Sequence, residues 1–294
     1  MVDLSRKTIE SLPEGYLARV VATALQEDIG AGDVTSQAII KPDALLTGEM
    51  LAKEAGVVAG LFVAREVFRQ VDPAVVLEQL VQDGTLVEAG SIVAKVSGKG
   101  PALLTAERVA LNFLQRMSGI ASMTRRYQDA IAGTRATVLD TRKTVPGLRL
   151  LDKLAVRLGG GANHRIGLYD MVLIKDNHIL ASGGIGAAVA QARAYPAARD
   201  LKIEVEVENL AQLDEALTLG VDRVMLDNMD VATMHEAVRR ASQAVELEAS
   251  GGITLDTIRS VAETGVDFIS VGALTHSVVA MDISLDLCVT NEER

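Results

Sequence analysis

The sequence predicts an α/β fold whose C-terminal half forms a parallel barrel. From about residue 135 onward, six short apolar segments recur, and each ends in a polar residue or a glycine. Stretches of helical periodicity separate several of them. Strands that alternate with helices on this scale form a parallel sheet with right-handed crossovers. Six such units in about 140 residues favour a compact barrel over an open sheet.

The predicted barrel strands share an apolar run that comes before the polar end. They are ATVLDT (136–141), DMVLIK (170–175), LKIEVEV (201–207), DRVMLD (222–227), VELEAS (245–250) and DFISVG (267–272). Two of the connecting stretches, NLAQLDEALTLG (209–220) and TLDTIRSVAETG (254–265), predict helices. Both end in glycine, which is a usual C-terminal stop of a helix.

The N-terminal half has a different pattern of predicted helices and strands. Residues 16–28, YLARVVATALQED, place apolar groups at helical spacing and predict an amphipathic helix. Residues 83–98, DGTLVEAGSIVAKVSG, predict two short strands around a turn. A biotinyl or lipoyl domain has a similar sequence pattern but needs a lysine at a hairpin tip. That lysine is missing here, so we interpret this segment as structural scaffold. Residues 105–117, TAERVALNFLQRM, predict a helix with Thr105 as its N-cap.

Charge is unevenly spread along the chain. The 294 residues carry a formal net charge of −10, yet the segment from Arg142 to Lys175 holds seven Arg or Lys and only two acids. That segment is therefore +5, and the remaining residues carry about −15. Because a protein that binds a long polyanion is basic overall, this pattern favours one focused anion site in an acidic protein.

The composition also argues against several classes of partner. Nucleic acid is not expected, because aromatic residues make up 3% of the chain, Trp is absent and no basic stripe is interleaved with stacking residues. The single Cys288 excludes an internal disulfide, a zinc cluster and a Cys-pair redox motif. The sequence has no apolar signal-peptide core and no run of 18 apolar residues. We therefore expect no membrane association and predict a cytoplasmic location.

The active site of an α/β barrel lies at the C-terminal mouth of its strands. Here the strands end in two cationic groups, two carboxylates and two glycine turns, in the order Thr141-Arg142-Lys143, Lys175, Glu206, Asp227, Ser250-Gly251-Gly252 and Val271-Gly272-Ala273. Barrels often bind phosphate on bare backbone N–H groups after their last two strands. Tight turns alone would explain one glycine turn, whereas two in succession favour phosphate.

The carboxylates admit more than one role. Glu204, Glu206 and Glu208 alternate along one predicted strand and so face the same side. Glu206 and Asp227 suit Mg²⁺ bound through water, or positive charge developing on a sugar. The other interpretation is a structural ion pair with one of the nearby cations, namely Lys202, Lys175 or Arg223. Because both acids end strands at the mouth, we favour a functional role.

The cations suit an anionic substrate. Arg142 can hold a carboxylate through two parallel hydrogen bonds, and Lys143 adds a point charge. His164 and Arg165 can donate to a carboxylate, and the glycine run before them suits either a lid or a phosphate-facing turn. A Schiff-base lysine of an aldolase would occupy the place of Lys175, but so many neighbouring cations favour electrostatic clamping.

A set of motifs runs from about residue 12 to residue 288. It comprises QEDIGAGDVTS, ERVALNFLQRMSGIAS, DTRKTVPGLR, GGGANHRIGLYDMVLIKDNH, EVEVENL, VMLDN, SGGI and VGALTHS. The set resembles the quinolinate phosphoribosyltransferase family, also called nicotinate-nucleotide pyrophosphorylase (carboxylating). Val145 and Leu154 depart from the family pattern, and neither departure removes a charged group.

The resemblance implies an activity and a domain plan. The activity is the reaction of quinolinate with phosphoribosyl pyrophosphate (PRPP) to give nicotinate mononucleotide, pyrophosphate and carbon dioxide in de novo NAD biosynthesis. Mg²⁺ is implied with PRPP, and no organic cofactor is expected. The implied plan is an N-terminal α/β sandwich-like domain, 1–114, joined by the tail 277–294, and an incomplete, TIM-like, phosphate-binding α/β barrel, 115–276. The family's barrel has seven strands, one more than the six predicted above.

The resemblance also implies residue roles. Thr141, Arg142, Lys143, His164, Arg165 and Lys175 match the substrate cradle, and Glu206 and Asp227 match acids near the ribose and its Mg²⁺. Ser250, Gly251, Gly252, Val271, Gly272 and Ala273 match the 5′-phosphate site. The expected catalytic residues are Lys143, Lys175, Glu206 and Asp227. Arg108 matches an arginine that family members insert into the neighbouring subunit's active site, which implies a homodimer.

Three other functions stay open at this point. The first is a phosphoribosyltransferase of the same architecture that acts on a monocarboxylate such as nicotinate. The second is a Schiff-base aldolase or lyase that uses Lys175, and the third is a non-catalytic, anion-binding paralogue. The density of cations argues against a monocarboxylate, and the presence of every matched cradle residue favours catalysis.

Overall fold

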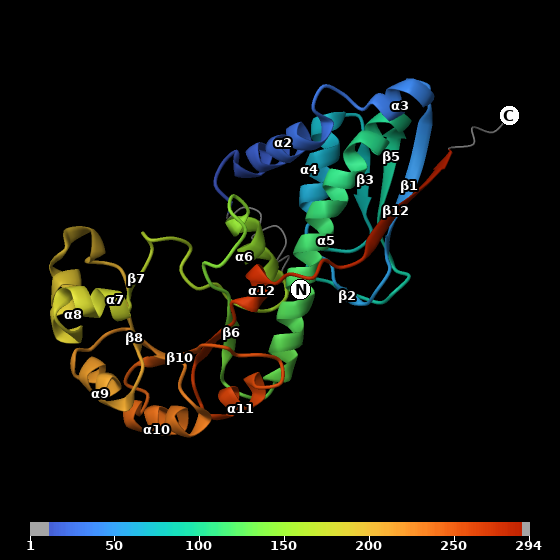
Figure 1. Ribbon diagram of the computed structural model, residues 1–294. Coiled ribbons are helices and arrows are strands. Elements are labelled where there is room, and N and C mark those ends of the chain that lie inside the picture. The colour runs from blue at the N-terminus through green and yellow to red at the C-terminus, as the bar shows by residue number, and fades with distance from the viewer. Residues whose placement is uncertain (1–11, 290–294) are drawn as a thin grey trace. The chain divides into compact units, whose positions relative to one another are not determined.

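The computed structural model describes residues 12–289, which divide into two compact units (Figure 1). The first unit contains the chain up to Met123, Val145–Gly160 and the chain from Ser277 on; the second contains Thr124–Thr144 and Gly161–His276. The boundary expected between residues 114 and 115 falls inside the continuous helix α5 (Gly100–Ala130), so the observed division comes later. Residues 145–160, expected in the barrel domain, lie with the first unit.

Helix α5 begins earlier than the sequence analysis predicts. Its first residues are Gly100 and Pro101, and proline suits the first turn of a helix because its missing N–H would have no partner there. The prediction of Thr105 as N-cap is therefore wrong. Thr105 lies inside the helix, and its hydroxyl donates to the Asp33 carboxylate at 3.0 Å. Asp33 in turn caps helix α3 (Val34–Ile39) by accepting from the Ser36 N–H at 2.9 Å.

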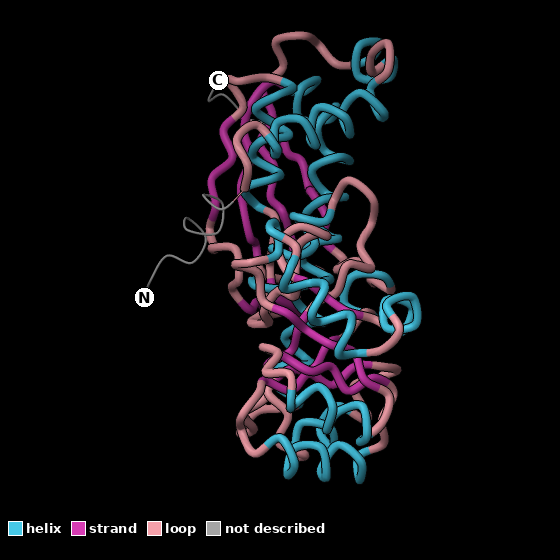
Figure 2. The backbone as a smooth tube through the Cα atoms, turned by 90° about the vertical axis from the view of Figure 1, so that its left-hand side faces the viewer, coloured by secondary structure: helices cyan, strands magenta, loops and turns pink. Residues whose placement is uncertain are grey.

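The first unit is built on a four-stranded antiparallel sheet in the order β12-β1-β5-β3. The strands are β1 (Leu45–Ala52), β3 (Val76–Gln79), β5 (Ile92–Lys99) and β12 (Ile283–Val289). Its helices include α2 (Tyr16–Ile29), which confirms the predicted amphipathic helix, α4 (Leu61–Val71) and α6 (Arg149–Leu158). Figure 2 shows the helices of this unit along one face of its sheet.

The two strands predicted in residues 83–98 form, but they do not pair with each other. Strand β4 (Leu86–Val87) pairs with β2 (Gly56–Val57), whereas β5 pairs with β1 and β3. The glycine-containing turn between them therefore joins two sheets and does not close a hairpin. Partner choice between strands is a non-local property, so the local turn signal could not predict it.

The second unit contains the predicted parallel sheet, with six strands in the order β6-β11-β10-β9-β8-β7. The strands are β6 (Thr137–Leu139), β7 (Val172–Ile174), β8 (Ile203–Val207), β9 (Arg223–Asp227), β10 (Glu246–Ser250) and β11 (Phe268–Ser270), which confirms all six predictions. Strand β8 is buried at four of its five positions and β9 at its three middle positions, as is usual where both faces of a parallel sheet are covered.

Helices cover the outer side of the curved sheet (Figure 1). They are α7 (Asp176–Ser182), α8 (Ile185–Ala194), α9 (Leu210–Thr218), α10 (Val231–Ala241) and α11 (Ile258–Glu263), whereas the short α12 (Ala273–His276) contributes residues to the pocket described below. The predicted helices in 209–220 and 254–265 are thus confirmed as α9 and α11. None of the helices in residues 12–289 is long and apolar enough to cross a bilayer.

The barrel is incomplete because β6 and β7 are both edges of the sheet. Beyond β6, Ala162 makes one isolated parallel bridge to Leu139. The Ala162 N–H donates to the Val138 carbonyl at 2.9 Å, and the Asp140 N–H donates to the Ala162 carbonyl at 3.3 Å. Where the family resemblance implies a seventh strand, the described residues have six strands and this single bridge.

Gly119 in α5 makes a close approach that a larger residue cannot make. A Cβ at this position would overlap the backbone carbonyl of Val279, in the segment that leads to β12. We expect Gly119→Ala to lower the free energy of unfolding by about 1–3 kcal/mol, because the obstacle is backbone and cannot rotate away. Urea denaturation followed by circular dichroism measures the change.

Gly186→Ala in helix α8 is the matched control. The nearest atom to its added Cβ is Glu215 Oε1 at 3.7 Å, an ordinary contact. Alanine is the better helix former, so this variant should be neutral or up to about 1 kcal/mol more stable. Equal destabilisation by both substitutions would contradict the packing assigned to Gly119.

Candidate active site

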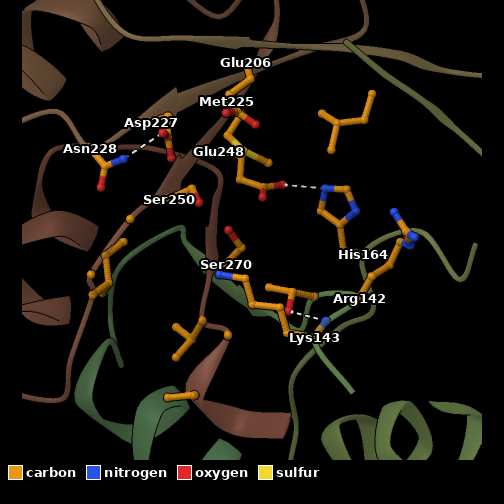
Figure 3. Close-up of a pocket in the computed structure, with 18 of the residues that line it drawn as sticks. Arg142, Lys143, His164, Glu206, Met225, Asp227, Asn228, Glu248, Ser250 and Ser270 are labelled. Carbon is orange, nitrogen blue, oxygen red and sulfur yellow. Dashed lines mark hydrogen bonds and ion pairs between the residues drawn. The ribbon is translucent and has the colours of Figure 1, made fainter. Parts of the chain in front are cut away.

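A pocket of about 800 Å³ opens at the C-terminal ends of the parallel strands, and every residue that lines it belongs to the second unit (Figure 3). The structure brings together nearly all the site residues predicted from sequence. Those that line the pocket are Thr141, Arg142, Lys143, His164, Arg165, Lys175, Glu206, Asp227, Ser250, Gly251, Gly252, Val271, Gly272 and Ala273. Arg108 does not line it; it is an exposed residue of helix α5 in the first unit.

The predicted cations Arg142, Lys143, Arg165 and Lys175 form what we call the cation side of the pocket. Burial, followed by the charge of Arg142, lowers the pKa of Arg165. Arg165 also donates from Nη1 to the Met171 carbonyl at 3.2 Å, which fixes the guanidinium near the pocket. Two guanidinium groups that repel each other in a half-buried position gain stability from an anion placed between them.

The loop after β6 is held in place by local hydrogen bonds. The Lys143 N–H donates to Thr141 Oγ1 at 3.1 Å, and Thr275 Oγ1 donates to the Lys143 carbonyl at 2.8 Å. A Cβ at Gly272 would lie 3.1 Å from the ring of His276 and 3.3 Å from Lys143 Cδ. The glycine turn after β11 is therefore packed closely against Lys143 of the β6 loop, and a larger residue there would need these side chains to shift.

Glu206 and Asp227 form what we call the acid side of the pocket, at the ends of β8 and β9 (Figure 3). Lys175 Nζ lies 3.1 Å from Glu206 Oε2, so the ion pair considered in the sequence analysis is present where the two sides meet. The Lys175 side chain is 45% exposed, so this pair is weak enough to yield to a ligand. Asp227 Oδ2 accepts from Asn228 Nδ2 at 2.7 Å.

His164 is more deeply engaged than the sequence predicts. Its Nδ1 accepts from the Arg165 N–H at 2.7 Å, which leaves the ring proton on Nε2. Nε2 lies 2.9 Å from Glu204 Oε2 and 3.5 Å from Glu248 Oε2. Both ring nitrogens thus face protein groups, and His164 also lines the pocket.

Glu204, Glu248 and Arg223 form a buried polar network that the sequence analysis missed, and Glu248 also lines the pocket. Both carboxylates are fully buried, and Arg223 Nη1 lies 3.1 Å from Glu248 Oε2. Burial raises the pKa of Glu204 to about 7. Burial, with the charge of Glu204 second, raises the pKa of Glu248 to about 7. Glu246 and Glu248 alternate along β10 as Glu204 and Glu206 do along β8, and this pattern was the available signal.

The three acids expected to face one side do not share one environment. Glu204 is buried, Glu206 lines the pocket, and Glu208 lies beyond the end of β8 and is exposed.

Two sets of groups offer metal ligands. The buried set is His164, Glu204 and Glu248, whose ligand atoms lie within 4.8 Å of one another. Arg223 already pairs with Glu248 of that set as a counter-charge. Glu206 and Asp227, at the mouth of the pocket, are instead open to a cation bound to a substrate.

The glycine turn after β10 has a backbone conformation that favours glycine. Gly251 and Gly252 both have left-handed φ angles, of 104° and 59°, which other residues adopt only at a cost. Residues 158–165 are tied to the edge of β6 through the bridge at Ala162, and Asn163 Nδ2 donates to Asp140 Oδ2 at 2.5 Å. Asn228, Thr254 and His276 also line the pocket and were not predicted.

Together, the open parallel sheet, the cation side, the acid side and the two glycine turns define an α/β-barrel enzyme for multiply charged, phosphorylated substrates. Sequence comparison makes the class specific. Residues 33–118 match the model of the quinolinate phosphoribosyl transferase N-terminal domain, and residues 120–286 match that of its C-terminal domain. The chain belongs to the quinolinate phosphoribosyl transferase family.

Individual relatives agree with this assignment. The chain is 46% identical over 293 residues to quinolinate phosphoribosyltransferase [decarboxylating] 1b of Nicotiana tabacum, covering 94% of this chain and 83% of that one. It is 45% identical over 266 residues to the probable nicotinate-nucleotide pyrophosphorylase [carboxylating] of Bacillus subtilis, covering 90% and 91%. The crystal structure of NadC from Streptococcus pyogenes superposes with a TM-score of 0.92 at 42% identity, covering 96% of this chain and 99% of that one.

Because the pKa of Glu248 is raised, we expect the stability of the folded protein to depend on pH. A buried carboxyl whose pKa rises from 4.5 to about 7 on folding stabilises the folded state below pH 4.5, and this contribution is lost as the pH rises through 7. Glutamine keeps the shape without the charge. We expect the melting temperature of Glu248→Gln, relative to the native protein, to be higher at pH 8 than at pH 5.

Differential scanning fluorimetry at the two pH values measures this difference. Glu263→Gln is the control, because Glu263 is an exposed helical residue that pairs with Arg259. Its effect should be small and alike at both pH values. A Glu248→Gln effect with no dependence on pH would contradict the account of the buried network.

Proposed function

We propose that the protein transfers the phosphoribosyl group of PRPP to quinolinate with decarboxylation, which gives nicotinate mononucleotide, pyrophosphate and carbon dioxide in de novo NAD biosynthesis. The observation that carries the proposal is the division of one pocket into a cation side and an acid side, in a chain of the quinolinate phosphoribosyl transferase family. Relatives are named for this decarboxylating reaction.

The cation side suits the two adjacent carboxylates of quinolinate. Arg142 and Arg165 can each form parallel N–H···O bonds with a planar carboxylate, and Lys143 and Lys175 add point charges. The repulsion between the two guanidinium groups falls when a dianion enters, so substrate binding relieves an unfavourable interaction of the free site. His164 supports this side through the Arg165 backbone.

The acid side suits the sugar. When the bond from the anomeric carbon to pyrophosphate breaks, positive charge develops on the ribose, and the carboxylates of Glu206 and Asp227 stabilise it electrostatically. The pyridine nitrogen then bonds to the anomeric carbon and becomes cationic. The cationic nitrogen stabilises the electron pair that stays on the ring carbon when the adjacent carboxylate departs as carbon dioxide, and that carbon then takes a proton from water, so no organic cofactor is required. The protein positions both reactants and excludes water.

The donor set at the acid side also fits Mg²⁺. This ion is usually held by one or two carboxylates together with substrate phosphates, and Glu206 and Asp227 supply two such oxygen donors at neighbouring strand ends. Bound with PRPP, Mg²⁺ would neutralise charge on the departing pyrophosphate. The backbone N–H groups of the two glycine turns, Ser250–Gly252 and Val271–Ala273, would hold the 5′-phosphate.

Lys175 has a neighbour that argues against Schiff-base chemistry. Its Nζ lies 3.1 Å from the Glu206 carboxylate, so the nitrogen is already engaged in an ion pair at the edge of the pocket. We therefore propose that Lys175 clamps the substrates as a cation.

A cytoplasmic location remains a prediction, and some relatives carry the words chloroplastic or mitochondrial in their names.

A single incubation tests the proposed function. Purified protein is mixed with PRPP, Mg²⁺ and quinolinate that carries a labelled 2-carboxylate, and a parallel tube contains nicotinate. We expect nicotinate mononucleotide and labelled carbon dioxide from quinolinate alone. Turnover with nicotinate only would keep the phosphate site but overturn the cation side as a dicarboxylate site. Folded protein that turns over neither substrate would support the anion-binding paralogue.

Arg142→Ala separates the two substrates. Because Arg142 is assigned to a carboxylate of quinolinate, its loss should weaken quinolinate binding by about 100-fold, the worth of a charge-assisted bidentate contact. PRPP binding should change by less than about fivefold, through the lost charge alone. Isothermal titration of each ligand measures both effects, and equal losses for the two ligands would refute the assignment.

We also propose a homodimer in which Arg108 completes the neighbouring active site. The support is that Arg108 is an exposed residue of α5 in the first unit and matches the family motif ERVALN, while every lining residue of the pocket belongs to the second unit. Complementation tests this. Arg108→Ala and Asp227→Ala proteins should each be inactive when assembled alone.

Mixed in equal amounts and reassembled, the two variants should regain activity. Half of the dimers become hybrids, and one of the two sites in each hybrid carries neither substitution, so about a quarter of the native activity should return. Size-exclusion chromatography confirms dimers of both variants beforehand. If Arg108 acted within its own chain, the hybrids would stay inactive, which would rule out the shared site.

A further inference from the structure

Asn228, directly after β9, holds a backbone conformation that few residues tolerate. Its φ angle is 53°, in the left-handed region, and among the described residues only Ser242 and Gln243 are other non-glycine residues with positive φ. Those two lie in the turn after helix α10, away from the pocket, whereas Asn228 lines the pocket. Non-glycine residues keep this conformation only where the surrounding structure fixes it, and such residues cluster at active sites.

The side chain of Asn228 is fixed by two contacts. Nδ2 donates to Asp227 Oδ2 at 2.7 Å (Figure 3). The other end of the amide lies over Gly251, where an added Cβ would overlap Asn228 Oδ1. The amide orientation follows from chemistry, because only the NH₂ end can face a carboxylate without repulsion. Gly251 thus provides the space that lets the amide face Asp227.

The backbone of Asn228 is held as firmly. Its N–H donates to the Ser250 carbonyl at 2.9 Å, which extends the β9–β10 ladder one residue beyond the pair Asp227–Ser250. The left-handed turn at Asn228 is what brings its own side chain back onto the residue before it. Asparagine is the residue other than glycine that best tolerates this conformation, and it alone combines that tolerance with a neutral donor of this length.

We infer that Asn228 is a positioning residue for the proposed transfer reaction: it holds Oδ2 of Asp227 and thereby presents the other carboxylate oxygen, Oδ1, to the ribose or the Mg²⁺ of PRPP. The inference rests on the proposed function, because it assigns Asp227 to PRPP. Asn228 acts through Asp227, so its loss should weaken the Mg²⁺–PRPP complex and leave quinolinate binding intact.

Two substitutions test the inference. Asn228→Gly removes the donor and keeps the left-handed backbone without strain; Asn228→Ala removes the donor and adds strain. Removing a group that orients a metal or charge ligand typically costs about 10- to 100-fold in affinity or activity. We expect both variants to bind PRPP with Mg²⁺ about 10- to 100-fold more weakly in isothermal titration. Quinolinate affinity should be unchanged, and only Asn228→Ala should melt at a lower temperature.

Ser242→Gly is the matched control. Ser242 has φ 47° at the C-terminus of helix α10 and is exposed, so glycine relieves the same backbone strain far from any substrate. It should raise the melting temperature slightly and leave both affinities and turnover unchanged.

The outcomes separate this inference from the proposed function. If the native protein forms nicotinate mononucleotide but Asn228→Gly binds PRPP with Mg²⁺ as tightly as the native protein does, the positioning role is refuted. Equal losses for PRPP and quinolinate, or a loss in Asn228→Ala only, would assign Asn228 a merely structural role and also overturn it. A native protein without turnover on quinolinate would refute the proposed function itself, and this inference with it.

Discussion

The structure depends on one constraint: six parallel strands end at the same edge, so whatever residues follow them must share one pocket. In this chain the edge gathers four cations from β6, β7 and the loop before β7, and two carboxylates from β8 and β9. Neither group would be stable alone in a half-buried place. The charges persist because each side offsets the other in part, as Lys175 and Glu206 do. In the proposed reaction an anionic substrate meets the cation side, and the Mg²⁺ that accompanies PRPP meets the acid side.

A second group of charged side chains lies on the same strands, deeper in the sheet. Glu204 and Glu248 lie on strands that flank β9 and are fully buried, with Arg223 and His164 as partners. The network orients His164, whose Nδ1 in turn accepts from the backbone of Arg165. The pocket lining, to which His164 and Glu248 themselves belong, is thus connected to the fully buried Glu204. His164 is thus held by the protein through both ring nitrogens, and its expected contact with substrate stays a prediction.

The sequence predicted the barrel better than the N-terminal unit, for a physical reason. Parallel strands buried on both faces leave long apolar runs whose polar ends mark the mouth, so β6 to β11 and most pocket residues could be located. The antiparallel unit depends on non-local choices, such as the pairing of β4 with β2. The start of α5 at Gly100, the buried Glu248 and the left-handed Asn228 also depend on tertiary packing, which local patterns do not encode.

The central claim is that the cation side is built for two adjacent carboxylates, and one titration tests it most directly. Quinolinate and nicotinate differ by one carboxylate, so each is titrated into the native protein without PRPP at low ionic strength. The account predicts at least about tenfold tighter binding of quinolinate, since one added charge-assisted contact is worth about 1.5–3 kcal/mol. Equal affinities, or tighter binding of nicotinate, would contradict it.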